Sequence, residues 1–518
     1  MIPAFLTILQ VMFLTRFSAS FIMGAQRRSF RNRLLPLRTS SITTTPDSSN
    51  AKVVVKRSRQ SMEFRKGSQL VFQGAVSYTT GGEEPPQMAD LVQVLVEQEK
   101  KKSSKKGAKN MYKHVSSPTT TTETQSLGWG VYNPKSLYRV RLLCHTNLQP
   151  ALSNELVTLD SHNRLRLILE NKISTALATR KAVGLPNTET DTYRLINGEG
   201  DGLSGLAVDI LGGKVAVIMS SATWCQIHQT TIQTALKEIL PSDFIIVWKT
   251  TPNRLKQDGW VEADDQRREE QVAENVDESI IVRESGVSYM TFPLHGQGQK
   301  TGFYCDQRDN RKHLASLCSG KRVLDLCCYH GGFSLTAKLL GGASHCTGVD
   351  SSQGAIDICN KNSKLNGLED DIFFEKGDIS KFMQEKAAQK QCWDVIVLDP
   401  PKLAPSVSGL DRASRKYHSF NRDAIALINQ DEGGLLLTCT CSAAMTQKNG
   451  GQYFLEVVQK AATSAGRSIT LLQTSGAAPC HTQSPASYPA GAYLTAALFY
   501  VAPTTMTLVK NEDKTKLT

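Results

Sequence analysis

The C-terminal part of the chain alternates short apolar runs with segments of helical periodicity. From Gly302 onward, runs of about four to eight apolar residues are each followed by a polar turn and an amphipathic stretch. This alternation predicts an α/β fold with a parallel, doubly wound sheet. The predicted strands are KRVLDLCCY (321–329), HCTGVDSS (345–352), DIFFEKGD (371–378), WDVIVLDPPK (393–402) and GGLLLTCTCS (433–442).

Two β-rich stretches near the N-terminus predict a small β-barrel. Residues 51–80 and 128–143 contain short strand-like runs, and the simplest arrangement joins them in one barrel. The intervening segment 81–127 is rich in Pro, Lys and Thr, which predicts a mostly flexible surface insertion. Within it, the apolar piece 91–96 resembles a short helix.

The middle of the chain predicts a second, smaller α/β domain. Residues 152–181 have helical periodicity, a strand–helix–strand pattern follows, and residues 279–294 resemble a β-hairpin. The acidic, Arg-containing segment 262–278 predicts an outward loop. The predicted boundaries are a leader 1–50, a barrel 51–147, a central domain 148–297, a ligand-binding domain 298–505 and a tail 506–518.

The leader has the composition of a targeting segment. Residues 1–50 carry six Arg and no acidic residue before Asp47, with an apolar opening and a Ser/Thr cluster. These features predict an organellar transit peptide, for a plastid or a mitochondrion. A disordered extension of a cytoplasmic protein is the alternative.

Composition excludes several classes of protein. At 518 residues, 40% hydrophobic and 21% charged, the chain is neither wholly disordered nor collagen-like. Residues 1–50 and 97–113 each carry a net charge of +5, which leaves only +2 of the total +12 for the rest. The total charge is therefore weak support for RNA binding. The chain contains no run of 18 or more apolar residues, so we expect no membrane-spanning helix in the mature protein. The 12 Cys do not have the spacing of a zinc site, so we expect no bound metal.

The turn after the first strand of the C-terminal domain predicts a cofactor site. Gly331 and Gly332 let the backbone approach a ligand, and Asp350 ends the next strand, where an acid can bind both ribose hydroxyls. Asp378, after the third strand, can bind an adenine amine. Because a GxGxxG pattern is missing, S-adenosylmethionine fits better than a dinucleotide. Each acid could instead be a strand-end cap. The candidate cofactor residues are Asp325, Tyr329, Gly331, Gly332, Phe333, Asp350, Ser351, Asp378 and Asp399.

Two further motifs point to chemistry on a nucleobase. Asp399-Pro400-Pro401-Lys402 ends the fourth strand, where a rigid lip could stack a flipped base, although an ordinary turn is the alternative. Cys441 ends the next strand at the same edge. A thiolate adding to carbon 6 of cytosine activates carbon 5 for methylation. Alternatively, Cys441 is an inert, buried side chain.

These motifs resemble those of the bacterial 23S ribosomal RNA cytosine-C5 methyltransferases of large-subunit methyltransferase I type. The similar segments are GQKTGFYCDQRDNR (298–311), LDLCCYHGGF, VDSSQGAIDICNKNSKLNG, VLDPPK, LLLTCTCSAAMT and the upstream YRLINGEGDGLSGLAVD. The resemblance implies an RNA-binding PUA domain, a middle α/β domain and a Rossmann-like class I methyltransferase domain. It also implies that Asp350 holds the ribose, Asp378 the adenine and Asp399 the target base, with Cys441 as nucleophile. Asp306, Gln307 and Arg308 would line the cofactor and substrate cleft.

Cys328, His330 and Ala443 depart from the pattern of the resembled enzymes. The turn reads Cys328-Tyr329-His330-Gly331-Gly332 instead of Ser-Tyr-Thr-Gly-Gly, and Ala443 replaces a Gly. Lys402 stands where other cytosine-C5 RNA methyltransferases carry a second Cys. As in the resembled family, another group must then support removal of the carbon 5 proton.

The sequence thus predicts an S-adenosylmethionine-dependent RNA methyltransferase that forms 5-methylcytosine in large-subunit ribosomal RNA. A guanine methyltransferase is one alternative, because Asp-Pro-Pro sites also serve purine chemistry. An RNA-binding ribosome-assembly factor with a vestigial methyltransferase fold is the other.

Overall fold

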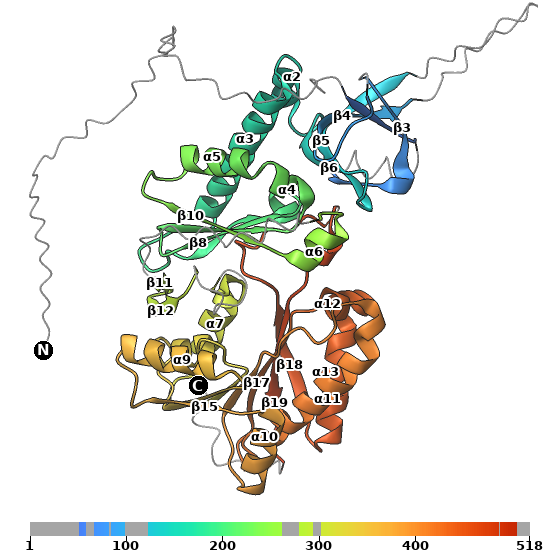
Figure 1. Cartoon of the computed structure of the whole chain (residues 1–518). Coiled ribbons are helices and arrows are strands. Elements are labelled where there is room, and N and C mark those ends of the chain that lie inside the picture. Colours follow the sequence, from blue (N-terminus) through green and yellow to red (C-terminus); the bar gives the residue numbers. More distant parts are fainter. Residues whose placement is uncertain are drawn as a thin grey trace, which may run out of the picture. The chain divides into compact units, whose positions relative to one another are not determined.

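The computed structural model describes residues 51–57, 67–81, 84–98, 123–261, 279–293, 302–485 and 487–504 (Figure 1). The predicted leader, the acidic loop 262–278, most of the Lys-rich run and the tail 506–518 lie outside these residues. Mixed α/β architecture, with a Rossmann-like sheet in the C-terminal part, confirms the predicted fold class.

The first strands form one curled half-barrel, blue to cyan in Figure 1. They are β1 (Lys52–Val55), β2 (Leu70–Phe72), β3 (Val76–Thr80), β4 (Leu91–Glu97), β5 (Thr124–Tyr132) and β6 (Tyr138–His145), in the order β2-β6-β5-β4-β1-β3. The prediction of a helix-like piece at 91–96 was wrong, because these residues form β4. Val92, Val94 and Val96 alternate into the core, at most 1% exposed, which is the period of a strand. Both ends of the predicted flexible insertion are therefore part of the sheet.

The central domain packs helices on a four-stranded sheet of order β10-β9-β8-β7. Its strands are β7 (Tyr193–Asn197), β8 (Leu206–Leu211), β9 (Val215–Ser220) and β10 (Ile245–Thr250), and its helices are α2 (Pro150–Leu156), α3 (Ser161–Ala182), α4 (Thr223–Ile227), α5 (Gln229–Ile239) and α6 (Pro252–Gln257). The predicted hairpin is confirmed as antiparallel β11 (Ile280–Glu284) and β12 (Val287–Thr291).

The C-terminal domain contains a seven-stranded sheet of order β15-β14-β13-β16-β17-β19-β18. Its strands are β13 (Arg322–Leu326), β14 (His345–Asp350), β15 (Ile372–Lys376), β16 (Val395–Leu398), β17 (Gly434–Thr440), β18 (Ile469–Ser475) and β19 (Thr495–Val501). The five predicted strands pair in parallel. The sheet is not wholly parallel, however, because β19 runs antiparallel to both β17 and β18.

Helices cover both faces of this sheet. They are α7 (Arg308–Ala315), α8 (Gly332–Leu339), α9 (Gln353–Leu365), α10 (Ile379–Ala388), α11 (Leu410–Ala426), α12 (Ala443–Gln447) and α13 (Gln452–Ser464). Side chains of successive strand residues point to opposite faces. Val397 therefore packs in one core with Leu335 of α8, and Leu398 in the other with Phe420 of α11. Because β16 is buried on both faces, its sequence is continuously apolar.

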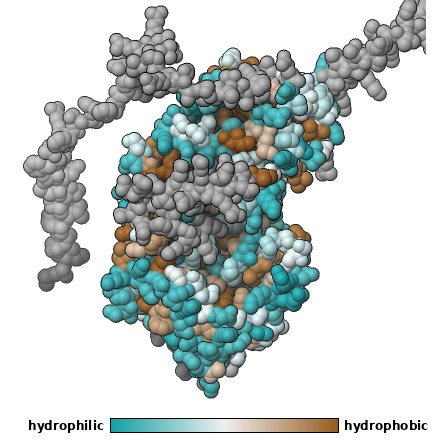
Figure 2. Space-filling view, viewed as in Figure 1, coloured by the Kyte–Doolittle hydropathy of each residue, from teal (hydrophilic) through white to brown (hydrophobic). Residues whose placement is uncertain are grey.

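In the part of the chain that the structure describes, no helix is long and apolar enough to cross a bilayer. On the face shown in Figure 2, hydrophobic side chains lie in several separate patches among hydrophilic ones.

We predict that Gly128→Ala destabilises the half-barrel. Gly128 has φ +151°, and a Cβ atom there would lie 2.0 Å from the Cys144 carbonyl oxygen on β6. Separating β5 from β6 should cost roughly 2–5 kcal/mol. Urea unfolding followed by tryptophan fluorescence measures the change in the first transition. Gly74→Ala, where a Cβ meets nothing within 4 Å, is the control. Equal midpoints for both variants would contradict the account.

Candidate functional site

The carboxyl ends of four parallel strands meet at one edge of the C-terminal sheet. The Asp399 amide donates to the Leu326 carbonyl (3.2 Å), and the Cys327 amide donates to the Val349 carbonyl (2.8 Å). The ends of β13, β14 and β16 are thereby fixed side by side. Asp350 is the last residue of β14, and Asp399 directly follows β16.

The turn between β13 and α8 is built around the buried carboxylate of Asp325. Its Oδ2 accepts hydrogen bonds from the Ser334 amide (3.1 Å) and hydroxyl (2.9 Å). Its Oδ1 has no hydrogen-bond partner among the described residues. Burial raises the pKa of Asp325 to about 6, against the opposing effect of the Ser334 hydrogen bonds. Gly331 has φ +78°, and a Cβ there would lie 2.8 Å from the Phe374 ring, so the turn requires glycine.

Two aromatic rings follow in the same turn. Tyr329 stacks on His330 with ring centroids 3.6 Å apart, and it contacts Tyr304 edge-on at 4.8 Å. His330 is 4% exposed, and burial lowers its pKa to about 3, so the ring is neutral. Phe333, one residue into α8, is buried in the core. Its side chain therefore serves packing.

Asp350 and Asp378 both bind backbone amides in addition to any ligand. Asp350 Oδ2 accepts from the Tyr329 amide (3.1 Å), and Oδ1 accepts from the Ser352 amide (2.9 Å). Asp378 is exposed, and its Oδ1 caps α10 through two amides at 2.9 and 3.1 Å. Its Oδ2 accepts no hydrogen bond among those found for the described residues. The capping role, which from the sequence alone was an alternative for each acid, is thus present at Asp378.

Four of the predicted acids lie close enough to the Cys327 thiol to affect its pKa. Burial raises its pKa, and the charges of four acids raise it further; these are Asp350, Asp399, Asp325 and Asp378. All four carboxylates therefore lie within electrostatic reach of one atom at the end of β13. The side chain of Ser351, next to Asp350, is exposed.

The segment before β13 reaches the same edge. Gln307 Nε2 donates to Asp399 Oδ2 (3.0 Å), and the Tyr493 hydroxyl donates to Asp306 Oδ2 (2.7 Å). Arg308, in contrast, contacts the Cys480 sulfur at 3.6 Å. Asp306 and Gln307 thus belong to the surroundings of Asp399, and Arg308 belongs to a neighbouring contact.

The carboxyl group of Asp399 is held partly protonated at neutral pH. Burial raises its pKa to about 7, and the charge of Asp306 adds to the effect, whereas the Gln307 hydrogen bond opposes it. Pro400 beside it is buried, and the next two residues, Pro401 and Lys402, are exposed. An acid with this pKa can donate or accept a proton near pH 7.

Cys441 is the more accessible of the two cysteines at the end of β17. It directly follows the strand and is partly exposed, whereas Cys439 is buried and its pKa is well above the usual range because of that burial. Burial raises the pKa of Tyr304, and the charges of Asp306, Cys441 and Asp399 contribute. Cys441 therefore lies in the same electrostatic cluster as Asp399. Sequence reasoning missed Tyr304, although it lies within the similar segment 298–311, and Tyr493, which lies in none of the motifs.

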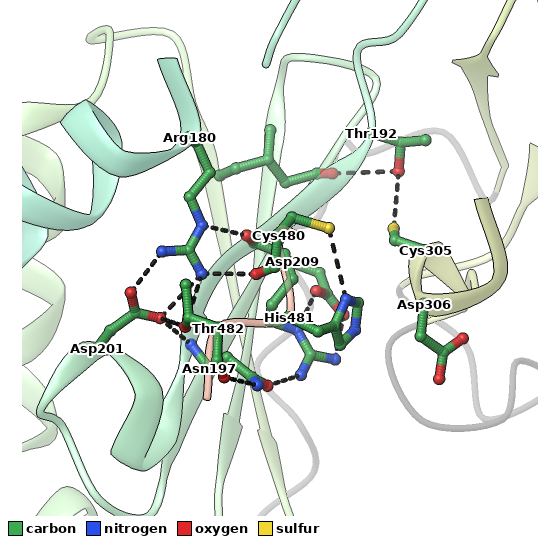
Figure 3. Close-up of polar contacts among 12 residues, drawn as sticks. Arg180, Thr192, Asn197, Asp201, Asp209, Cys305, Asp306, Cys480, His481 and Thr482 are labelled. Carbon is green, nitrogen blue, oxygen red and sulfur yellow. Dashed lines mark hydrogen bonds and ion pairs between the residues drawn. The ribbon is translucent and has the colours of Figure 1, made fainter. Parts of the chain in front are cut away.

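A buried polar network links the central domain to this edge (Figure 3). Arg180 of α3, 0% exposed, forms a two-pronged ion pair with Asp201 and donates to the Cys480 carbonyl at 2.7 Å. The Thr482 hydroxyl also donates to Asp201 at 2.8 Å. Two residues before Cys480, the Ala478 amide donates to the Asp306 carbonyl at 2.8 Å. Segment 478–482, held from the central domain, therefore fixes Asp306.

No metal-binding cluster was found in the described ranges of the chain: no group of three or more His, Cys, Asp or Glu residues could hold an ion there.

Comparison with known proteins places these residues in a family. Residues 261–475 match the family model for S-adenosylmethionine-dependent methyltransferases. A protein of Aeromonas hydrophila named ribosomal RNA large subunit methyltransferase I is 37% identical over 303 residues, 58% of this chain and 72% of its own. A protein of the same name from Klebsiella pneumoniae is 35% identical over 305 residues, 59% of this chain and 72% of its own.

Solved structures support the fold. A crystal structure of a methyltransferase complexed with SAH aligns with 87% of this chain and 99% of its own, with a TM-score of 0.63 and 19% identity. An S-adenosylmethionine-dependent methyltransferase from Streptococcus mutans gives the same values. At this identity the likeness shows a shared fold.

We predict that Arg180→Met strongly destabilises the protein. The substitution leaves the Asp201 carboxylate buried and unpaired, which should cost about 3–5 kcal/mol. The urea midpoint of the central-domain transition measures the loss. The control is Arg166→Met on the same helix, which breaks an exposed pair with Glu170 and should change the midpoint little. An Arg180→Met midpoint equal to that of the control would refute the prediction.

Proposed function

Because the chain belongs to the ribosomal RNA large subunit methyltransferase I family, we propose that it methylates carbon 5 of a cytosine in large-subunit ribosomal RNA. The names of its relatives support the RNA substrate, and the family model supports S-adenosylmethionine. The observation that carries the proposal for cytosine is the position of Cys441 at the same sheet edge as Asp399. A partly exposed thiol and a partly protonated acid follow neighbouring strands, whose register pairs Leu398 with Thr438.

The residues at the end of β13 and β14 fit an adenosine-bearing cofactor. Asp325 keeps a buried oxygen that has no hydrogen-bond partner among the described residues. Asp350 would hold the ribose hydroxyls, and the remaining oxygen of Asp378 would accept from the adenine amine. Tyr329, Gly332 and Ser351 would line the pocket. When bound, S-adenosylmethionine supplies an electrophilic methyl group.

The Asp399-Pro400-Pro401-Lys402 segment would hold the target base. Two consecutive prolines fix the backbone, so they present a rigid lip on which a flipped base can stack. Gln307 keeps the Asp399 carboxyl in place through its 3.0 Å hydrogen bond. Asp306 completes the surroundings of Asp399 as a positioning residue, whereas Arg308 contacts the Cys480 sulfur outside them.

Cys441 and Asp399 would activate the cytosine ring together, Cys441 as the nucleophile and Asp399 as the proton donor. The Cys441 thiolate forms an Sγ–C6 bond, and the electron pair of the C5–C6 double bond moves toward the ring nitrogen N3. Asp399, protonated, donates its proton to N3 and leaves carbon 5 nucleophilic. After methylation, N3 returns its proton to the Asp399 carboxylate, and a base accepts the C5 proton. The electron pair of the C5–H bond restores the C5–C6 double bond and breaks the Sγ–C6 bond, which releases the Cys441 thiolate.

We also propose a role for the half-barrel and a location for the protein. The half-barrel within 51–147 would act as a PUA-like RNA-binding domain, supported by its curled six-stranded sheet. The Arg-rich, acid-poor residues 1–50 would direct the protein to an organelle, supported by composition alone.

We predict that Cys441→Ala abolishes methyl transfer. Without the thiolate carbon 5 stays unreactive, so the rate should fall at least ~10³-fold. The assay uses labelled S-adenosylmethionine and unmodified large-subunit ribosomal RNA, with nucleosides resolved by mass spectrometry. Cys392→Ala, another partly exposed cysteine, is the control. Label in a guanosine derivative, or full activity of Cys441→Ala, would overturn the mechanism. Cofactor binding without transfer to ribosomal RNA would indicate a different acceptor, and failure to bind S-adenosylmethionine as well would favour the assembly-factor alternative.

The pH dependence of transfer should report on Asp399. If Asp399 acts as an acid, kcat/KM falls as pH rises through about 7, where the carboxyl ionises. Asp306→Asn removes a charge that raises this pKa, so the descending limb should move to lower pH. Gln307→Met removes a hydrogen bond that lowers it, so the limb should move to higher pH. Shifts in the same direction, or none, would exclude Asp399 as the acid.

A further inference from the structure

A basic groove lies beside the Asp-Pro-Pro lip. It has a volume of about 550 Å³ and runs between the loop after β16 and helix α11. Its polar lining consists of Lys402, Arg412, Arg415, Lys416 and Ser419, with no acidic side chain. The four cationic side chains are all exposed.

The spacing of these residues places them on one face of α11. Arg412, Arg415, Lys416 and Ser419 are three, four and seven residues apart, the positions that share a helix face. The opposite face is buried through residues such as Tyr417 and makes the helix amphipathic. Sequence periodicity thus directs the cations into the groove.

The cations of the groove have no acidic partner in the described part of the chain. None of the ion pairs found there includes one of the four, whereas Arg422 further along α11 pairs with Asp423 at 2.7 Å. Like charges three and four residues apart repel each other and weaken a helix. The Lys416 ammonium also lies 4.4 Å from the centre of the Phe420 ring, which limits its freedom. This arrangement favours an anionic ligand.

The two sequence neighbours of Cys441 contact the elements that form the groove. The hydroxyls of Tyr417 and Thr440 are 2.8 Å apart, and the Ser442 hydroxyl donates to the Ala404 carbonyl. Thr440 and Ser442 flank Cys441 in sequence. Lys402 belongs both to the lip and to the groove lining. A ligand in the groove would therefore lie next to the base pocket.

We propose that the basic groove binds the phosphates of the RNA strand that flanks the target base. This inference rests on the proposed function and adds a substrate-positioning surface to it. Arginine side chains bind phosphate oxygens in pairs, and lysines add salt-sensitive point charges. Such contacts position the strand without reading its sequence, as a flipped nucleotide requires on either side.

The test compares two charge-matched triple variants of the full chain. The groove variant is Arg412→Ala/Arg415→Ala/Lys416→Ala, and the control is Lys181→Ala/Lys237→Ala/Lys364→Ala, three exposed lysines elsewhere. Binding of a fluorescein-labelled oligocytidylate is measured by anisotropy over a range of salt concentrations. Loss of three phosphate contacts should reduce the slope of log K against log salt by about 2. The groove variant should also bind at least ~10-fold more weakly at low salt and raise KM for ribosomal RNA more than it lowers kcat.

The outcomes separate this proposal from the proposed function. Equal affinity and slope for both variants would overturn the groove, whatever the wild-type protein methylates. Loss of binding in the groove variant, combined with no 5-methylcytidine from the wild type, would keep the groove and refute the cytosine chemistry. Polyglutamate of equal charge that displaces the oligonucleotide equally well would indicate an acidic-protein site and overturn the RNA assignment.

Discussion

The site depends on the parallel pairing of β13 with both of its neighbours. Because β14 and β16 are hydrogen-bonded to β13 in the same direction, their carboxyl ends stop at one edge. Asp350 is the last residue of β14, Asp399 directly follows β16, and Asp325 fixes the turn after β13. Burial at this edge raises the pKa of Asp399, and the charge of the neighbouring Asp306 adds to the rise. The topology that gathers the acids therefore also contributes to the raised pKa of Asp399.

Much of the fold could be predicted because the parallel strands are buried on both faces. Strands such as β16 have continuously apolar sequences, which leave little choice of structure. Strand β18 escaped prediction because most of its side chains are exposed, so its sequence lacks a burial pattern. β4 was misassigned because a short apolar run does not distinguish helix from strand by itself. Its alternating buried valines did carry the correct period.

The site was predictable where it follows strand ends and unpredictable where distant segments meet. Asp350, Asp399 and Cys441 lie directly at strand ends, so counting along the chain sufficed. The Arg180 contact with Cys480 spans 300 residues, and neither residue belongs to a motif. The position of Arg308 against Cys480, away from Asp399, likewise depends on packing between segments. The resemblance to a known family implied the roles of single residues. The contacts between distant segments could be seen only in the folded chain.

The covalent bond between Cys441 and the target cytosine is the central claim. Ribosomal RNA containing 5-fluorocytidine tests it directly, because fluorine at carbon 5 cannot leave as a proton does, and the adduct persists. After incubation with S-adenosylmethionine and nuclease digestion, peptide mass spectrometry locates the modified residue. The account predicts a methylated 5-fluorocytidine nucleotide attached to Cys441. An adduct on another cysteine, or none under conditions where normal RNA gains 5-methylcytidine, would contradict it.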